Sequence, residues 1–103
     1  MRYDRHHILF TRKNYNKGYA HLLRKAFVYE IPMNIHQDLH ATIGPVPPIS
    51  EKEAEWLWAE YKKANRNMEL YEALAWLQLH APNSEFAIAI MAQAGFLRNR
   101  GVL

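Results

Sequence analysis

A break near the middle of the chain constrains its fold more than any other feature. Gly44 is followed by the run Pro-Val-Pro-Pro. Glycine readily ends a helix, and proline can continue neither a helix nor a central strand. Residues 45–49 are therefore predicted to be a stiff, extended connector. It separates residues 1–44 from residues 50–103, which have different patterns.

Before the connector, the pattern predicts strand, loop, strand and helix, with a short helix inserted in the loop. The predicted elements are a strand over 3–10, a loop over 11–18, a short helix over 19–26, a strand over 27–31 and a helix over 35–43. In the short helix, Leu22 and Leu23 are expected to face inward. Asn34 is a favourable N-cap for the last helix. In that helix an apolar residue recurs every four positions, which indicates one buried stripe.

After the connector, the pattern is entirely helical. The predicted helices cover residues 51–66, 68–80 and 85–97. Ser50 and Glu53 form a capping box for the first, and Ser84 is a candidate cap for the last. The last helix is apolar nearly all the way round, so it is predicted to be the most buried. The predicted fold class is α+β and mostly α, in a single domain over residues 1–103, because 103 residues suit one domain.

The composition excludes several classes of protein. The absence of cysteine removes disulfides, cysteine-ligated zinc and thiol catalysis. No apolar run approaches the roughly 20 residues that a membrane span needs, so no membrane partner is expected. The N-terminal segment lacks the apolar core of a signal peptide. We therefore expect a cytoplasmic protein.

The positive charge is concentrated before the connector. Residues 1–43 contain seven Lys and Arg against three acidic residues, whereas residues 44–103 contain six against seven. A basic face suits a polyanionic partner, although a mildly basic, hydrated surface explains the same count. The candidate nucleic-acid contacts are Arg12, Lys13, Lys17, Arg24 and Lys25.

Five of the six histidines lie within residues 4–40. His36 and His40 are four positions apart on a predicted helix, so they lie on one face and can share a metal ion. His6 or His7 could supply a third ligand if the first strand packs beside that helix. Three imidazoles favour a transition ion and leave an open position for water or phosphate, as catalytic sites do.

The spacing of these residues is similar to a known motif. Asp4-x-His6-His7 followed by His36-x-x-x-His40 resembles the HNH, or His-Me finger, endonucleases, most closely the nuclease domains of DNase colicins and pyocins. The resemblance covers about 40 residues and ends near Ile43. It implies that residues 1–44 form a ββα-metal finger, which the later helices support.

The resemblance also implies a role for each motif residue. His6, His36 and His40 would bind one divalent ion (Zn, Mg, Mn or Ni), and His7 would be the general base. Asp4 would orient a ligand histidine. Arg5, between Asp4 and His6, could clamp the scissile phosphate.

Three functions remain open at this point. The first is a metal-dependent endonuclease that cuts nucleic acid, with DNA expected ahead of RNA. The second is a non-catalytic interaction or inhibitor protein with a protein partner, built on a degenerate finger. The third is a helical nucleic-acid-binding module in which the histidines are incidental.

Phe27 stands where the family usually has asparagine. In a regular strand His6 and His7 point to opposite faces, so both reach one site only if the strand kinks or ends there.

Overall fold

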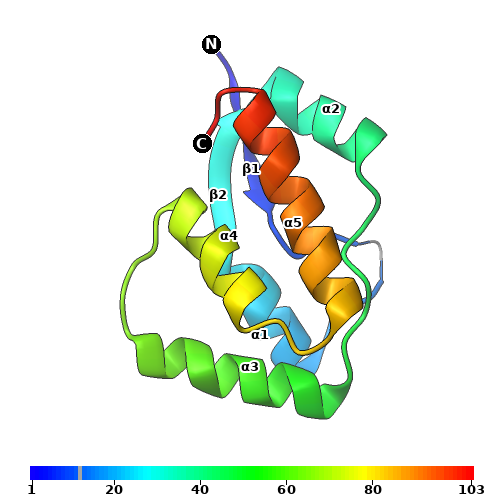
Figure 1. Cartoon of the computed structure of the whole chain (residues 1–103), viewed down its shortest axis with the longest axis vertical. Coiled ribbons are helices and arrows are strands. Elements are labelled where there is room, and N and C mark those ends of the chain that lie inside the picture. Colours follow the sequence, from blue (N-terminus) through cyan, green and yellow to red (C-terminus); the bar gives the residue numbers. More distant parts are fainter. Residues whose placement is uncertain (12) are drawn as a thin grey trace.

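The computed structural model describes residues 1–11 and 13–103. In that part of the chain, five helices and a two-stranded sheet form a mostly helical α+β fold, which confirms the predicted fold class at this coarser level (Figure 1). The elements are β1 (Tyr3–His7), α1 (Gly18–Ala26), β2 (Val28–Pro32), α2 (Met33–Thr42), α3 (Glu51–Ala64), α4 (Leu70–Leu79) and α5 (Ser84–Asn99).

The two strands are antiparallel, and His6 lies opposite Tyr29 in their register. β1 ends at His7, three residues before the predicted end of the strand. The next residues, Ile8, Leu9 and Phe10, are all buried. Successive side chains of a strand face opposite sides of the sheet, so three consecutive buried residues require the chain to leave the sheet and enter the core.

The helix that carries two of the histidines begins earlier than predicted. α2 starts at Met33, directly after β2, and Pro32 rather than Asn34 occupies its N-cap position. No side chain caps this end. Instead, the backbone N–H of Met33 donates to the carbonyl of Arg2 at 2.9 Å, so the strand satisfies one of the free donors of the helix. The Asn34 cap was therefore a wrong prediction.

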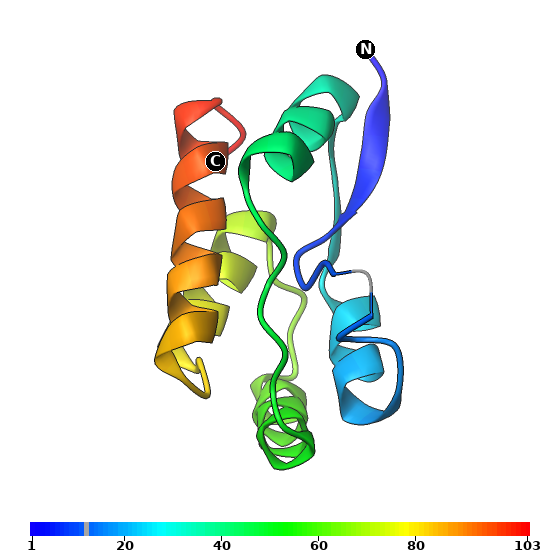
Figure 2. The ribbon, with the colours of Figure 1, turned by 90° about the vertical axis from the view of Figure 1, so that its right-hand side faces the viewer.

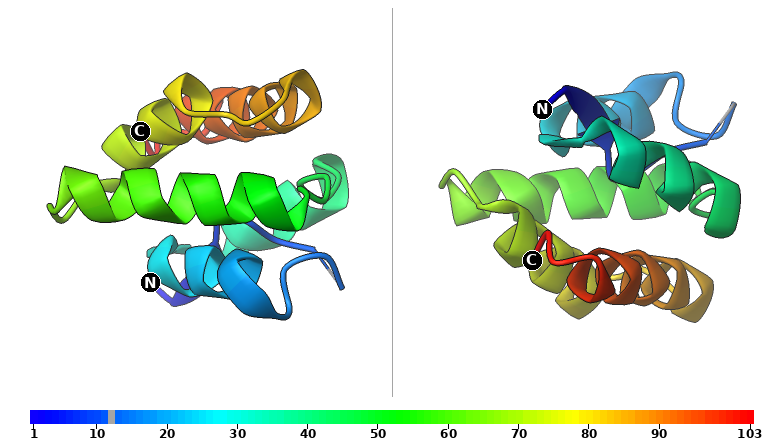
Figure 3. Two further views of the ribbon diagram at one scale, coloured as in Figure 1. Left: turned by 90° about the horizontal axis from the view of Figure 1, so that it is seen from below. Right: turned by 90° about the horizontal axis from the view of Figure 1, so that it is seen from above.

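Helix α3 lies between two groups of elements. α1 packs on α3, and α4 packs on α5. Figure 2 looks along α3, and Figure 3 shows α3 lengthwise. In both, α4 and α5 lie on one side of α3, and the strands with α1 lie on the other. A single hydrophobic cluster joins residues from both sides of the connector, including Phe27 and Ile31 before it and Leu57 and Phe86 after it.

Two tyrosines tie the first part of the chain to the rest. The Tyr15 hydroxyl donates to the carbonyl of Pro47 at 2.6 Å, and the Tyr29 hydroxyl donates to the carbonyl of Met68 at 2.9 Å. Each phenol ring is at least partly buried. These hydrogen bonds fix the strands and the loop after β1 against the connector and the start of α4.

Two burial predictions were wrong. α5 exposes Ile88 and Met91 by 63% and 56%, because other elements cover only part of its circumference. Leu22 is 40% exposed, and only Leu23 faces the core from that pair. The cap of α5 also differs from the prediction. Asn83, and not Ser84, caps this helix, since its side chain accepts from the N–H of Phe86 at 2.9 Å.

Among the described residues, no helix is both long enough and apolar enough to cross a membrane.

Candidate metal centre

Three histidines from two elements meet beside the sheet. His6 belongs to β1, and His36 and His40 lie one turn apart on α2. One ring nitrogen from each of the three lies within 4.8 Å of the others. The Nε2 atoms of His36 and His40 are 3.0 Å apart. This arrangement could hold a metal ion, as the spacing of the histidines predicted.

The alternation of side chains along β1 explains why this cluster forms. Asp4 and His6 both point toward α2. The Asp4 carboxylate accepts from Nδ1 of His36 at 3.1 Å. The His6 ring lies edge-on to those of His36 and His40, with centroid separations of 5.3 and 6.1 Å. His6 is completely buried, whereas His40 is exposed.

The hydrogen bonds determine which ring nitrogens face the cluster. Because Nδ1 of His36 donates to Asp4, Nε2 of His36 carries the lone pair of the ring, which faces Nε2 of His40 at 3.0 Å. Nε2 of His6 is 2.7 Å from the Oε1 atom of Gln93 on α5. Nδ1 of His6 is buried and has no hydrogen-bond partner among the described residues.

The residues present fit a metal ion. A buried polar atom without a partner is uncommon in folded proteins, and a ligand ion would satisfy it. Zinc binds histidine nitrogen at about 2.0–2.1 Å, which places tetrahedral ligand atoms about 3.3 Å apart. The Nε2 atoms of His36 and His40 are 3.0 Å apart, close to this spacing, and the His6 nitrogen lies within 4.8 Å of both ligand atoms. Both outer hydrogen bonds, to Asp4 and to Gln93, are of the kind that orients ligand histidines.

The electrostatics of the cluster favour neutral imidazoles. Burial lowers the pKa of His6 to about 4, while the hydrogen bond to Gln93 opposes this shift and the neighbouring His36 and His40 add to it. Burial also lowers the pKa of His40, and His36 lowers it further. Neutral imidazole is the form that binds metal. His6 and His40 are therefore ready to act as ligands near pH 7.

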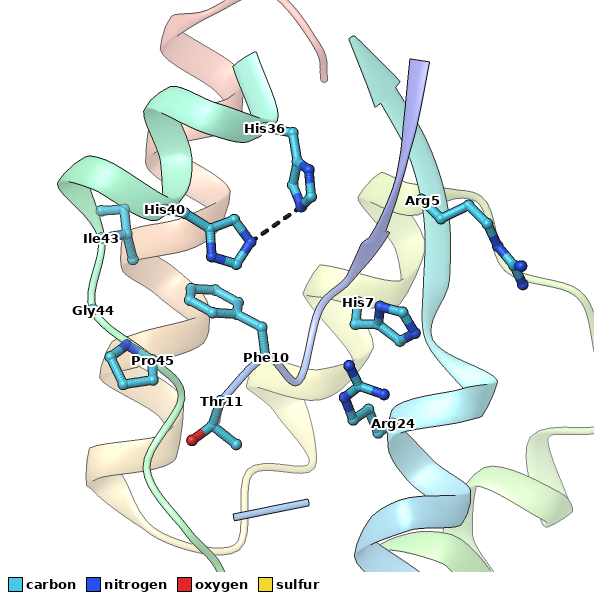
Figure 4. Close-up of a pocket in the computed structure, with 10 residues that line it drawn as sticks. All are labelled: Arg5, His7, Phe10, Thr11, Arg24, His36, His40, Ile43, Gly44 and Pro45. Atoms are coloured by element: carbon cyan, nitrogen blue, oxygen red, sulfur yellow. Dashed lines mark hydrogen bonds between the residues drawn. The ribbon is translucent and has the colours of Figure 1, made fainter. Parts of the chain in front are cut away.

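A pocket of about 720 Å³ opens next to the three histidines. Figure 4 shows the residues that line it, with His36 and His40 on one side and His7 and Arg24 on the other. The lining consists of Arg5, His7, Phe10, Thr11, Arg24, His36, His40, Ile43, Gly44 and Pro45. A ligand in this pocket could therefore touch residues of β1, α1 and α2 together.

His7 lies across β1 from His6. The register of β1 stays regular through both residues, so there is no kink between them. However, β1 ends at His7, and the pocket extends around this end so that His7 and His36 both border it. Burial lowers the pKa of His7, and the positive charges of Arg24 and Arg5 lower it further. His7 is thus neutral and able to accept a proton near pH 7.

The predicted nucleic-acid contacts do not all lie at the pocket. Arg24 lines it beside His7, and Arg5, which shares a face of β1 with His7, also lines it. Lys13, Lys17 and Lys25 are exposed and do not line it. Arg12 lies outside the described residues.

Sequence reasoning missed one residue of the site, Gln93. It is a fully buried polar residue between apolar neighbours on α5. A glutamine on the apolar face of a helix was the available signal, because a buried amide needs hydrogen-bond partners. Phe27, at the position where the similar family usually has asparagine, is fully buried in the core and does not line the pocket.

Comparison of the chain with models of protein families, with curated proteins and with solved structures finds no match.

Proposed function

We propose that this protein is a metal-dependent endonuclease that hydrolyses phosphodiester bonds in nucleic acid, with DNA as the first expected substrate. One observation carries the proposal: three histidine nitrogens gather within 4.8 Å of one another, and two of these histidines, His36 and His40, line a pocket together with His7 and Arg24. This combines a candidate ion site, a base and a cation for phosphate in one place. The residues are those of the motif that resembles the His-Me finger endonucleases.

The pocket residues suggest how a substrate would bind. Arg24 and Arg5 supply positive charge that attracts the phosphate backbone, and Arg24 lies beside His7. His6, His36 and His40 would hold one divalent ion at the opposite side of the phosphate. A bound divalent ion would offset the charge that develops on the phosphate and on the leaving oxygen.

His7 would act as the general base. As it takes a proton from water, the water oxygen forms a bond to phosphorus and the bond from phosphorus to the 3′ oxygen breaks. The 3′ oxygen leaves with the electron pair of that bond and takes up a proton from solvent. A neutral imidazole suits this role because it can accept a proton from water. The exposed mouth of the pocket gives water and substrate access to His7.

Cleavage of supercoiled plasmid tests the proposal. The purified protein should nick plasmid with Mg²⁺, Mn²⁺, Ni²⁺ or Zn²⁺, and EDTA should stop the reaction. His7→Ala should lower the rate at least about 100-fold, which is a typical contribution of a general base. Its metal content and circular dichroism spectrum should stay unchanged, because His7 is not among the clustered histidines.

His21→Ala is a matched control. It also removes one histidine, but from α1 and away from the lining of the pocket, and it should keep full activity. Full activity of His7→Ala would disprove the role of His7. No cleavage by the wild-type protein with any of these ions, despite stoichiometric metal binding, would disprove the proposed activity.

A second function is favoured by one specific observation, which is that His6 and His7 belong to the same regular strand and point to opposite sides of it. In a non-catalytic interaction protein the three histidines would hold a structural ion, and His7 and the arginines would serve only to bind a partner. Such a protein would bind metal without cutting nucleic acid. The cleavage assay together with elemental analysis separates the two functions.

A further inference from the structure

The buried glutamine of α5 makes two hydrogen bonds to the first strand and its end. The Gln93 amide nitrogen donates to the carbonyl of Ile8 at 3.1 Å, and its Oε1 atom lies 2.7 Å from Nε2 of His6. These contacts join positions 85 and 87 residues apart in the sequence. Gln93 and His6 are both completely buried. Both polar atoms of the amide are thus satisfied where water does not reach.

The contact with Ile8 settles the orientation of the amide. A backbone carbonyl can only accept a hydrogen bond, so the NH₂ group of Gln93 must face Ile8. The oxygen of the amide therefore faces His6, and Nε2 of His6 must donate to it. A neutral imidazole carries one N–H, so Nδ1 of His6 is left with a free lone pair. This is the buried nitrogen that has no partner among the described residues.

Gln93 therefore does for His6 what Asp4 does for His36. Asp4 accepts from Nδ1 of His36 and leaves Nε2 to face the cluster. Gln93 accepts from Nε2 of His6 and leaves the lone pair of the buried Nδ1 atom without a partner among the described residues. The two histidines thus present different ring nitrogens, and each choice is made by the group behind the ring. The neutral amide suits the fully buried ring, since a carboxylate there would be costly to desolvate.

We propose that Gln93 is a positioning residue for the metal centre, which holds His6 as the Nε2–H tautomer and directs its Nδ1 atom to the ion. This inference rests on the metal binding that the proposed function requires. It also extends the centre beyond the ββα unit, because the orientation of one ligand depends on α5. A purely structural Gln93 would cap the carbonyl of Ile8 and have no effect on metal affinity beyond its effect on folding.

The tautomer of His6 can be read directly. In the metal-free protein, long-range ¹H–¹⁵N NMR spectra distinguish imidazole protonated at Nε2 from imidazole protonated at Nδ1. We expect the Nε2–H tautomer for His6 in the wild-type protein. The Nδ1–H tautomer would overturn the proposal, because Gln93 would then not set the tautomer of this ring.

Metal titration of variants provides the second test. Gln93→Met has a similar length but makes neither hydrogen bond, and it should lower the affinity for Zn²⁺ or Co²⁺ about 10- to 100-fold. Gln93→Glu keeps an acceptor opposite His6, but it loses the donor to Ile8 and buries a carboxyl group, which should lower the melting temperature. Its affinity for metal in the folded state should stay within a few-fold of wild type. Wild-type affinity in Gln93→Met, or an equal loss in both variants, would overturn the proposal.

Leu97→Ala is the matched control for stability. It removes a fully buried apolar side chain from the same helix, and this side chain cannot make a hydrogen bond to His6. It should lower the melting temperature at least as much as Gln93→Met and leave the affinity for metal unchanged. If Leu97→Ala weakens metal binding as much as Gln93→Met does, the effect of Gln93 is only on folding and the proposal fails.

The tests separate this inference from the proposed function. Metal binding with His6 in the Nδ1–H tautomer would disprove the role of Gln93 and leave the nuclease untouched. Absence of metal binding in the wild-type protein would disprove both. Metal binding that depends on Gln93, without any cleavage of nucleic acid, would disprove the nuclease and keep the inference.

Discussion

The two parts of the chain on either side of the connector differ in what they contribute. Residues 1–44 supply nearly all the polar groups at the candidate centre and most of the positive charge. Their strands are five residues long, and α1 and α2 have nine and ten residues. A two-stranded sheet of that size is not stable alone in water. Residues 50–103 supply long helices and much of the core, but only Gln93 to the centre.

The groups of the candidate centre and the helices that stabilise the fold therefore come mainly from different parts of the chain. Residues 1–44 can expose polar and titratable groups because the later helices bury their apolar side. α3 has a complete capping box formed by Ser50 and Glu53, which satisfies free N–H groups at its start. Hydrogen bonds made by Tyr15, Tyr29 and Gln93 hold residues 1–44 against the rest of the chain.

The largest expected effect is that of removing residues 45–103. A peptide of residues 1–44 should be unfolded and should bind metal weakly, because Leu23, Phe27 and Ile31 would lose the apolar residues that cover them. Circular dichroism and zinc titration would measure this. A folded peptide with the zinc affinity of the full chain would show that the ββα unit is independent of the helices.

A cavity beside α5 should lower the free energy of unfolding without changing the affinity for metal. Phe86 is completely buried, so Phe86→Ala should cost about 3–5 kcal/mol in the free energy of unfolding, measured with urea. Below the transition, the metal affinity of the folded protein should be unchanged. The control is Ile88→Ala on the same helix, which should change stability by no more than about 0.5 kcal/mol because Ile88 is exposed. Equal losses in the two variants would contradict the burial described for α5.

A change among the clustered histidines should instead lower the affinity for metal and leave the stability nearly unchanged. His40→Ala removes one of the clustered nitrogens and should weaken metal binding at least about 100-fold, measured by competition with a zinc indicator. Its melting temperature without metal should stay close to that of the wild type, because His40 is exposed. His21→Ala should keep its metal affinity. Unchanged affinity in His40→Ala would exclude the three-histidine centre.

High pH should weaken the link at Tyr29. Burial raises the pKa of Tyr29 to about 12, and Tyr61 and nearby glutamates add to this shift. The pKa of a phenol in the unfolded chain is about 10. Folding therefore opposes ionisation, so the stabilisation is complete below about pH 10 and is lost as the pH rises toward 12. Thermal melts between pH 8 and 12 should show this decline.

Removal of the Tyr29 hydroxyl should separate this effect from general alkaline unfolding. Tyr29→Phe should cost about 0.5–1.5 kcal/mol at pH 7 through the lost hydrogen bond to Met68. It should also flatten the decline in stability above pH 10. The exposed Tyr71 gives the control, because Tyr71→Phe should leave the pH profile unchanged. A decline as steep in Tyr29→Phe as in wild type would exclude Tyr29 as its source.

The smallest expected effect is at an exposed link. Arg100 donates to Asp38 at 2.7 Å and joins the end of α5 to α2, but both side chains are about half exposed. Asp38→Asn should cost no more than about 1 kcal/mol, and less at high salt. Urea unfolding at low and high salt would measure it. A loss above about 2 kcal/mol would show that this pair is a main support of α2.

Local patterns predicted much of the fold. The connector, the capping box and the helices after it follow from interactions within a few residues, and the structure confirms their order. The pairing of His36 with His40 is local as well, because one helical turn brings them together. Errors occurred where tertiary contacts replaced local ones, as at Met33, whose N–H donates to the carbonyl of Arg2 in place of an Asn34 cap.

The sequence by itself determined which residues could form a metal centre, since type and spacing place His36 and His40 on one helical face and leave His6 or His7 of the first strand as the third ligand. Only the tertiary structure decided the rest. It brought Gln93 against His6, placed His7 around the end of β1, and left one face of α5 uncovered. The physical reason is that these features depend on contacts between distant segments, and their partners are chosen when the two halves pack together.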